Sequence, residues 1–173
     1  MNDVCLRNVD LIDKEIIFKW ILNPDLRKMI GTRGEPTKQE HNIWFERKIN
    51  DKGNEFLIIE YGGKAVGIIG TNKIDCANKN AEMYLYIGET EEQGKGIAYS
   101  AVKLFIKMLN FKYHFHKIYA RIFSYNLASI KLFEKCNFKI EGRFIDYIYL
   151  PEKKEYCDLL WYGYICKEEM CDE

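Results

Sequence analysis

The stretch from Gln93 to Ala98, QGKGIA, has the residue types of a turn that binds phosphate. Its two glycines allow positive φ angles, and the apolar pattern beyond them predicts a helix. The first N–H groups of a helix have no partner inside it, so they can donate hydrogen bonds to a pyrophosphate. The glycine spacing fits neither a Walker loop nor the dinucleotide-binding fingerprint. Taken alone, these residues are equally well explained as a plain turn between a strand and a helix.

A second motif runs from Asn126 to Phe138 and reads NLASIKLFEKCNF. Together the two segments resemble the GNAT superfamily of acetyl-CoA-dependent N-acetyltransferases. The family's signature Gln/Arg-x-x-Gly-x-Gly/Ala is matched in full by Gln93, Gly96 and Ala98. The second segment matches the family's other signature, which opens on Asn and closes on Glu-Lys-x-Gly-Phe, with departures. Two linked motifs in the right order are a more specific signal than one short motif.

This resemblance covers nearly the whole chain, from Leu6 to about Ile165. It implies a single GNAT acetyltransferase domain over residues 1–173. Because residues 167–173 are mostly charged, we expect them to form a frayed tail. The implied fold class is α/β (α+β). Its central sheet is mixed, has about seven strands that are splayed in the middle, and carries helices on both faces.

The resemblance also implies acetyl-CoA as co-substrate and no metal. Acetyl-CoA would lie in a V-shaped gap between strands at 81–87 and 118–124. Its pyrophosphate would meet the N–H groups of 94–99, and its pantetheine arm would pair with the backbone of 85–87 like an added strand. Asn126 would reach the pantetheine end while also capping a helix. The predicted cofactor-binding residues are Leu85, Tyr86, Ile87, Gln93, Gly94, Lys95, Gly96, Ile97, Ala98, Tyr99, Asn126, Ser129, Phe133 and Lys135.

The implied reaction is aminolysis of a thioester, which needs a base for the amine and a donor for the oxyanion. Many members of the family use a tyrosine as general acid where this sequence has Phe133, which has no proton to give. Ser129, one helical turn earlier on the same face, is the first substitute. Tyr84, Tyr86, Tyr125 and a bound water are the others. Glu82 shares a strand face with Tyr84 and Tyr86 and is the candidate base, directly or through water. The alternatives are a solvated carboxylate at Glu82 and, at Ser129, a hydroxyl that satisfies a backbone group.

Three short segments resemble the nucleotide-sugar amine acetyltransferases of this superfamily. They are HNIWF at 41–45, IGET at 87–90, and the pair EGR at 141–143 with EYCD at 155–158. They imply, as acceptor, the 4-amino group of a nucleotide-linked aminodeoxysugar. Such an amine has a pKa nearer ~8 than the ~10.4 of lysine, so it needs only a weak base. The alternatives are spermidine or another polyamine, a protein N-terminus of the ribosomal-protein type, and a non-catalytic acetyl-CoA-binding protein.

Composition excludes several function classes. The 173 residues carry 26 Lys and Arg against 26 Asp and Glu, without the basic excess that neutralises nucleic-acid phosphates. No apolar run approaches the ~20 residues of a membrane span, and the first residues lack a signal-peptide layout. The six cysteines form no CxxC pair, which favours reduced thiols. We therefore expect a cytoplasmic protein that acts on a small-molecule amine, with no nucleic-acid or membrane partner; a homodimer is left open.

The elements that must position these residues follow from apolar periodicity and capping residues. Alternation predicts strands at residues 4–9, 55–61, 64–74, 81–87, 118–124, 138–149 and 156–165. Gly62-Gly63 predicts the turn of a hairpin. Asp13 is expected to cap a first helix that ends at Asn23-Pro24, and Thr37 to begin a second helix with a capping box. Two further helices are expected, one directly after the glycine turn and a short one that Asn126 caps and that ends near Cys136.

Overall fold

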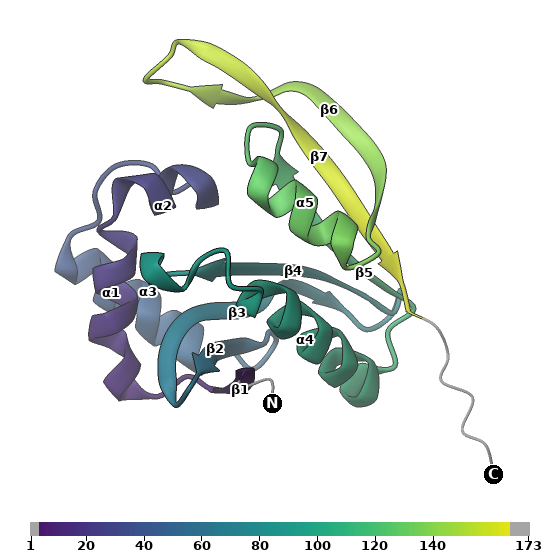
Figure 1. Ribbon diagram of the computed structural model, residues 1–173, viewed down its shortest axis with the longest axis horizontal. Helices are drawn as coiled ribbons and strands as arrows, with labels where there is room; N and C mark the ends of the chain where they lie inside the picture. The colour runs from purple at the N-terminus through teal and green to yellow at the C-terminus, as the bar shows by residue number, and fades with distance from the viewer. Residues whose placement is uncertain (1–3, 167–173) are drawn as a thin grey trace. The chain divides into compact units, whose positions relative to one another are not determined.

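The computed structural model describes residues 4–166. In that range, seven strands form one sheet in the order β1-β2-β3-β4-β5-β7-β6, and five α-helices accompany it (Figure 1). This mixed α/β arrangement confirms the predicted fold class. The predicted frayed tail, 167–173, lies outside the described residues.

The chain divides into two compact units. One consists of Met1–Asn72 with Tyr84–Phe105, and the other of Lys73–Met83 with Ile106–Glu173. The elements β3, β4 and α4 each run from one unit into the other. The expectation of a single domain therefore stays a prediction.

The sheet of the first unit is antiparallel where β1, β2 and β3 pair. Gly62 and Gly63 have φ angles of 56° and 76°, as the predicted hairpin turn requires. β4 follows β3 in the strand order and contributes residues 84–87 to this unit. The strand bounds are β1 (Val4–Asn8), β2 (Phe56–Tyr61), β3 (Lys64–Asp75) and β4 (Asn80–Ile87).

The first helix, α1 (Lys14–Ile21), is not capped as the sequence predicts. Asp13 precedes it but makes no side-chain cap hydrogen bond to it. Its carboxylate instead accepts from two nitrogens of Arg7, at 2.7 and 2.8 Å, and from the backbone N–H of Asp10 at 2.8 Å. Asp10 caps a short 3₁₀ turn, η1 (Leu11–Asp13). The prediction was wrong because the charged partner of Asp13 lies on another element.

The segment Asn23-Pro24 ends α1 as predicted, but it also begins a helix that the sequence analysis missed. Asn23 Oδ1 accepts from the backbone N–H of Asp25 at 2.9 Å, and Pro24 occupies the first position of α2 (Pro24–Ile30). Proline suits that position because the N–H that it lacks would have no helical partner there. The predicted capping box at Thr37 is confirmed at the start of α3 (Lys38–Asn50).

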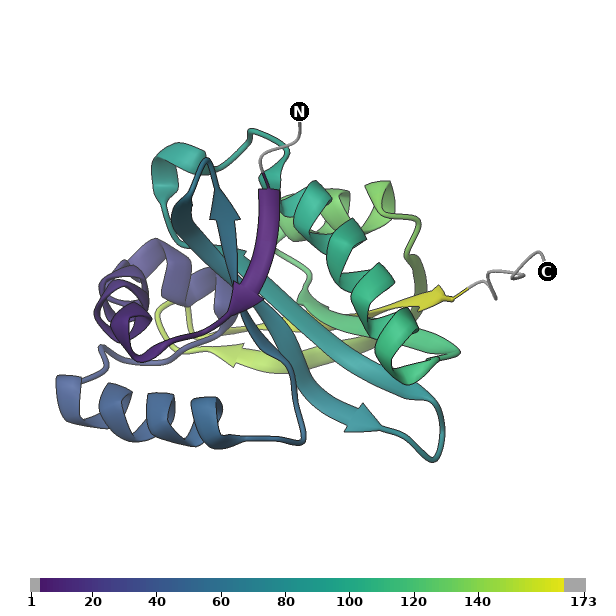
Figure 2. The ribbon, with the colours of Figure 1, turned by 90° about the horizontal axis from the view of Figure 1, so that it is seen from below.

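The core of the first unit forms where α1 and α3 cover one face of the strands. Ile17 and Trp20 from α1 and Phe45 from α3 pack on Ile58 and Ile68 of the sheet. Figure 2 shows α3 on one side of strands β2–β4 and α4 (Ile97–Tyr113) on the other. Tyr84 and Tyr86 of β4 face the same cluster.

In the second unit, the first residues of β4 pair with a parallel neighbour. Asn80–Glu82 pairs with residues 117–119 of β5 (Lys117–Phe123). β5 then pairs antiparallel with β7 (Glu155–Ile165), and β7 with β6 (Lys139–Leu150). Helix α5 (Leu127–Lys135) begins after Asn126. This order puts Glu82 and the Asn126 motif in one unit.

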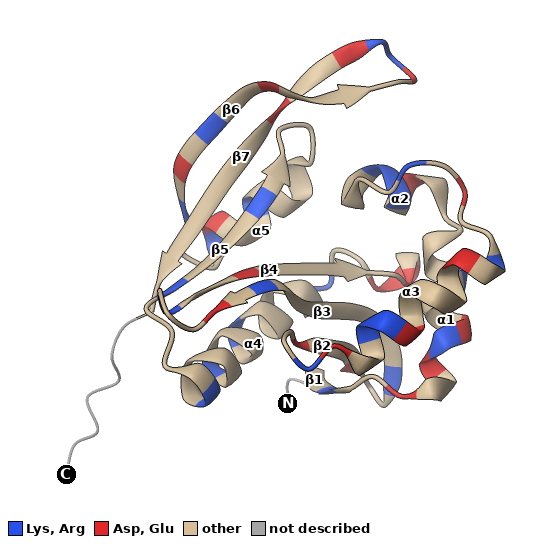
Figure 3. Cartoon of the chain, turned by 180° about the vertical axis from the view of Figure 1, so that it is seen from behind, with Lys and Arg blue, Asp and Glu red and all other residues tan. Residues whose placement is uncertain are grey.

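The ribbon formed by β6 and β7 continues past the end of β5. The last pair of β5 with β7 is Phe123 with Leu159, whereas β6 and β7 stay paired out to Leu150 with Glu155. Figure 3 shows Lys and Arg beside Asp and Glu along this ribbon and along α1, so neither charge sign gathers there. Among residues 4–166, no helix is long and apolar enough to cross a membrane.

Candidate active site

The turn before α4 has the backbone that the phosphate-binding prediction requires. Gly94 and Gly96 have φ angles of 77° and 82°, where residues with a side chain are strained. Neither glycine is crowded, since an added Cβ would meet nothing within 4 Å. The backbone N–H of Ser100 donates to the Gly96 carbonyl at 3.2 Å, so the helix begins with the turn at Ile97. The N–H groups of this first turn are the ones that an anion site would use.

The side chains of the turn are held by nearby groups. Gln93 Nε2 donates to the Ile87 carbonyl oxygen at 3.0 Å, which ties the turn to the end of β4. Lys95 Nζ lies 2.9 Å from Glu92 Oε2. Lys95 is therefore an exposed, ion-paired lysine in this structure, and its contact with a phosphate stays a prediction. Of the other predicted contacts, Ile97 is buried, and Ala98 and Tyr99 are half-buried in the first turn of α4.

The loop between β4 and this turn is fastened to α1, which the sequence analysis missed. Trp20 Nε1 donates to Glu89 Oε1 at 2.8 Å. The Trp20 ring also covers Gly88, where any side chain would collide with it. The N–H groups of Gly88 and Glu89 both donate to the Val66 carbonyl, at 2.8 and 3.1 Å. No spacing in the sequence links Trp20 to Glu89, because 69 positions separate them.

The strand residues Tyr84 and Tyr86 point into the core of the first unit. Their hydroxyl oxygens are buried and have no hydrogen-bond partner among the described residues. Burial raises the pKa of both phenols well above the ordinary value near 10. A phenol in that state exchanges protons poorly. The catalytic role of Tyr84 and the cofactor contacts of Tyr86 and Leu85 stay predictions.

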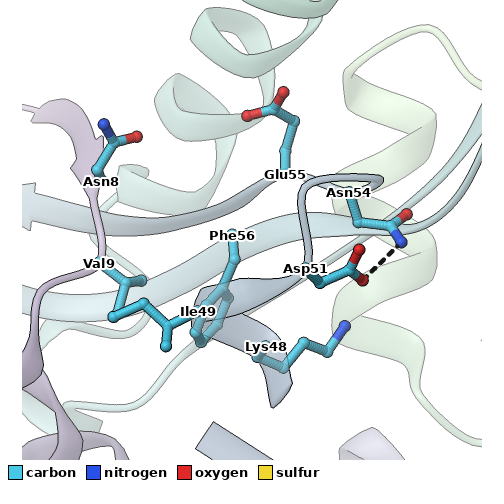
Figure 4. A pocket seen from close by; sticks show the side chains of 8 residues that line it. All are labelled: Asn8, Val9, Lys48, Ile49, Asp51, Asn54, Glu55 and Phe56. Atoms are coloured by element: carbon cyan, nitrogen blue, oxygen red, sulfur yellow. Dashed lines mark hydrogen bonds between the residues drawn. The ribbon is translucent and has the colours of Figure 1, made fainter. Parts of the chain in front are cut away.

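A small hollow lies at the C-terminal end of α3. Figure 4 shows Asn8 and Val9 on one side of it and Lys48, Asp51 and Asn54 on the other, where Asn54 Nδ2 donates to Asp51 Oδ2 at 2.9 Å. Lys48 Nζ sits 5.1 Å from the centre of the Tyr84 ring. The volume, about 160 Å³, is below the roughly 300–1,000 Å³ of typical ligand pockets. Its volume therefore gives no support for a ligand site there.

In the second unit, Glu82 is held by an arginine that the sequence analysis did not single out. Arg121 Nε and Nη2 each lie 2.9 Å from Glu82 Oε1. Glu82 is only 7% exposed, so the alternative interpretation of this residue as a solvated carboxylate does not hold. Tyr119 faces it in the parallel register. Glu82 is the last of the three β4 residues that pair with β5. The structure thus places a carboxylate of fixed orientation at the end of this pairing.

The second motif forms α5 and its cap. Asn126 Oδ1 accepts from the backbone N–H of Ser129 at 3.1 Å, which confirms Asn126 as the helix cap. Ser129 is half-buried in the first turn and Lys135 is exposed in the last. Phe133 is 3% exposed and packs edge to face on Phe138 at 4.9 Å. Phe133 therefore belongs to the core of this unit, and cofactor contacts of these residues stay predictions.

Comparison with known proteins identifies the family. The chain matches the model of the acetyltransferase (GNAT) domain over residues 3–139. The chain belongs to the GNAT acetyltransferase family. This membership confirms the predicted enzyme class, an acyltransferase of the N-acetyltransferase type, and acetyl-CoA as its co-substrate. The predicted gap for acetyl-CoA between β4 and β5 involves both compact units and stays a prediction.

Similar proteins come from archaea and bacteria. An uncharacterized protein of Methanocaldococcus jannaschii is 31% identical over 152 residues, which cover 86% of this chain and 31% of that protein. A prophage-derived uncharacterized N-acetyltransferase of Bacillus subtilis is 26% identical over 149 residues, 86% of this chain and 82% of the relative. The Escherichia coli spermidine N(1)-acetyltransferase is 26% identical over 98 residues, 57% of this chain and 52% of the relative. The chain thus spans under a third of the archaeal protein and about half of the E. coli enzyme.

Solved structures share the fold. The spermidine N-acetyltransferase of Vibrio cholerae, in complex with CoA and spermine, has a TM-score of 0.86 at 20% identity and covers 94% of this chain and 95% of its own. The microcin C7 self-immunity acetyltransferase, in complex with acetyl-CoA and AMP, has a TM-score of 0.83 at 21% identity and covers 96% and 94%. At these identities the likeness shows the fold, which agrees with the family match.

Proposed function

We propose that this protein transfers the acetyl group of acetyl-CoA to a primary amine of a small molecule of the polyamine class. The turn around Gly94 and Gly96, fixed to β4 by Gln93, supports the donor half of this reaction. The acceptor half is supported by relatives named spermidine N(1)-acetyltransferase in E. coli and V. cholerae. The nucleotide-linked sugar amine expected from short segments finds no such support, so the polyamine alternative replaces it. The cytoplasmic location stays a prediction.

On the donor side, this chain supplies backbone N–H groups and a glycine turn. The N–H groups at the start of α4 would bind the pyrophosphate, and the glycines let the chain approach it closely. Within the first unit, 84–87 is the last strand of the order β1 to β4, so its outer edge can pair with an extended pantetheine arm. The bound acetyl-CoA supplies the thioester and the thiolate leaving group.

On the acceptor side, we assign proton removal to Glu82. A polyamine has amine pKa values near the ~10.4 of lysine, so at neutral pH it arrives protonated and a base must take its proton. Arg121 fixes the orientation of this carboxylate. The Ser129 hydroxyl, in the first turn of α5, is the proposed proton source for the thiolate. A thiol of pKa ~8.5 leaves readily, so the loss of the family's tyrosine at Phe133 is tolerable.

Thiol release from acetyl-CoA in the presence of an amine panel tests the proposal. The panel contains spermidine, spermine, a nucleotide-linked 4-amino sugar and a peptide with a free N-terminus. We expect release with spermidine or spermine at a rate well above the no-amine blank. Release with the amino sugar alone would restore the earlier expectation, and release with the peptide alone would favour a protein substrate. Binding of acetyl-CoA without release on any amine would identify a non-catalytic binding protein.

The oligomeric state is part of the same proposal. One V. cholerae spermidine N-acetyltransferase structure is described as dodecameric. We propose that this chain also self-associates, and light scattering after size-exclusion chromatography would measure it. A mass equal to one chain at micromolar concentration would contradict self-association.

A further inference from the structure

The contact between Trp20 and Glu89 joins a buried helix residue to the loop that leads into the phosphate-binding turn. Trp20 is 2% exposed, and its indole lies edge to face on Tyr86 at 6.2 Å and over Gly88. Its one N–H donates to Glu89 Oε1 at 2.8 Å. Lys19 Nζ lies 3.8 Å from the same oxygen, although its side chain is 73% exposed. The loop carboxylate is thus directed to α1 by a buried donor.

The negative charge of Glu89 explains why the orientation of its side chain affects ligand binding. A carboxylate in a loop that binds a pyrophosphate repels the ligand unless the carboxylate is held away from it or neutralised. The buried indole N–H and the nearby lysine do both for Glu89. The two N–H groups of Gly88 and Glu89 that share the Val66 carbonyl fix the backbone at the same point. At the far end of the loop, the Gln93 side chain donates a hydrogen bond to the Ile87 carbonyl oxygen, so the loop is held at both ends.

We infer that Trp20 and Glu89 are positioning residues for acetyl-CoA: their hydrogen bond holds the β4–α4 loop in the conformation that presents the glycine turn to the pyrophosphate. This inference rests on the proposed function, because it concerns the donor half of the same site. It adds a role for α1, which contributes no predicted ligand. Its physical basis is preorganisation, since a loop that is already ordered loses less entropy when the ligand binds.

The conservative pair of variants Glu89→Gln and Glu89→Ala tests the bond. Glutamine keeps an oxygen that can accept from the indole, whereas alanine removes it. The bond borders a hollow of about 250 Å³, so neither change disturbs packed core. The charge-matched control is Glu91→Ala, because Glu91 is an exposed carboxylate of the same loop. Isothermal titration calorimetry gives the dissociation constant of acetyl-CoA for each variant, and thermal unfolding gives its stability.

We expect Glu89→Ala to raise the dissociation constant about tenfold, because it removes the hydrogen bond that orders the loop. Glu89→Gln and Glu91→Ala should stay within about twofold of the unsubstituted protein. A merely structural bond would lower the unfolding temperature of Glu89→Ala and leave its dissociation constant unchanged, which would overturn the inference. Equal weakening in the alanine and glutamine variants would overturn it too, because the charge and not the bond would then matter.

Failure of the proposed function gives a different result. If the donor half of that proposal is wrong, the unsubstituted protein itself does not bind acetyl-CoA. If only the acceptor half is wrong, it binds acetyl-CoA but releases no thiol with any amine. Binding by the unsubstituted protein, with no loss in Glu89→Ala, would leave the proposed function intact and overturn only the positioning role. A second variant, Trp20→Phe, should reproduce the loss seen in Glu89→Ala if it folds. In the double variant Trp20→Phe with Glu89→Ala, the two losses should not add, because they remove one bond.

Discussion

Arg121 holds Glu82 through two donors on one oxygen: Nε and Nη2 each lie 2.9 Å from Oε1. Both side chains come from neighbouring parallel strands, and Glu82 is almost wholly buried. A buried carboxylate is tolerated when a guanidinium pairs with it, and losing either partner leaves an uncompensated charge. The pair is therefore both a structural element and the support of the proposed base.

Glu82→Gln should lower kcat by about 10²–10⁴-fold, because glutamine cannot take the proton of the amine. The dissociation constant of acetyl-CoA should change by less than about twofold, since the base is proposed to act on the acceptor. Initial rates of thiol release and calorimetry measure the two quantities. The matched control is Glu141→Gln, which removes the carboxylate of the Lys117–Glu141 ion pair in the same unit. Full activity in Glu82→Gln would show that another group is the base.

Asn126 allows capping to be separated from ligand binding. Asn126→Ala removes the acceptor of the Ser129 N–H and should destabilise the protein by about 1 kcal/mol. For a chain of this length that corresponds to a fall in unfolding temperature of roughly 2–4 °C. Asn126→Ser keeps a capping oxygen and should keep most of the stability. If the amide also reaches the pantetheine, both variants should weaken acetyl-CoA binding to a similar degree, whereas normal binding in both would confine Asn126 to capping.

Gly96→Ala tests the turn by introducing backbone strain. A residue with a Cβ at the φ of 82° costs roughly 1–2 kcal/mol, which the turn can relieve by changing conformation. We expect acetyl-CoA to bind at least about tenfold more weakly, as measured by calorimetry. Gly63→Ala is the control, because its φ of 76° brings similar strain to a hairpin away from the turn. That variant should be less stable but bind normally; equal binding by both variants would mean that the turn does not contact the ligand.

His41 should make the stability of the protein depend on pH. Burial lowers its pKa, and the hydrogen bond between Nε2 and the Lys14 carbonyl offsets this only in part. Its Nδ1 atom is buried with no partner among the described residues, so protonation there adds an unsatisfied donor. As pH falls, the unfolded chain takes up the proton first, near its ordinary pKa of ~6.5. The free energy of unfolding should therefore be level above about pH 6.5 and decline below it.

Urea denaturation between about pH 7.5 and 5.5 measures this decline. His41→Phe keeps the stacking on Phe18 and Trp44 but has no titratable nitrogen, so its stability should vary less with pH over the same interval. An equal slope in the two proteins would assign the effect to other groups.

The parts of this fold that the sequence predicted correctly are set by contacts between near neighbours. The Gly62-Gly63 turn, the capping box of Thr37 with Glu40 and the cap of Asn126 each involve residues within a few positions. The same holds for the two motifs. The glycines of the first indicate positive φ angles, and the asparagine that opens the second indicates a helix cap. Pro24 was misread because a proline both ends one helix and suits the first position of the next.

The side-chain partners could not be predicted in the same way. Arg121 lies 39 positions from Glu82, and Glu89 lies 69 positions from Trp20. Such pairs depend on strand order and on how a helix packs, neither of which a local pattern contains. Asp13 is an example. Its residue type and position suit a helix cap, but its carboxylate accepts hydrogen bonds from Arg7 instead. Burial of the Tyr84 hydroxyl likewise follows from the helices that cover the sheet face.

The interrupted pairing of β6 protects this end of the sheet from aggregation. β6 is the last strand of the described sheet, and such an edge can recruit a strand from another chain. Its register with β7 shifts between Phe144 and Ile148, where Asp146 has a positive φ and donates its N–H to the carboxylate of Asp158, which also pairs with Arg143. An incoming strand could therefore bond only to the short stretches on either side of this bulge. The long ribbon stays exposed without offering a continuous template for fibril growth.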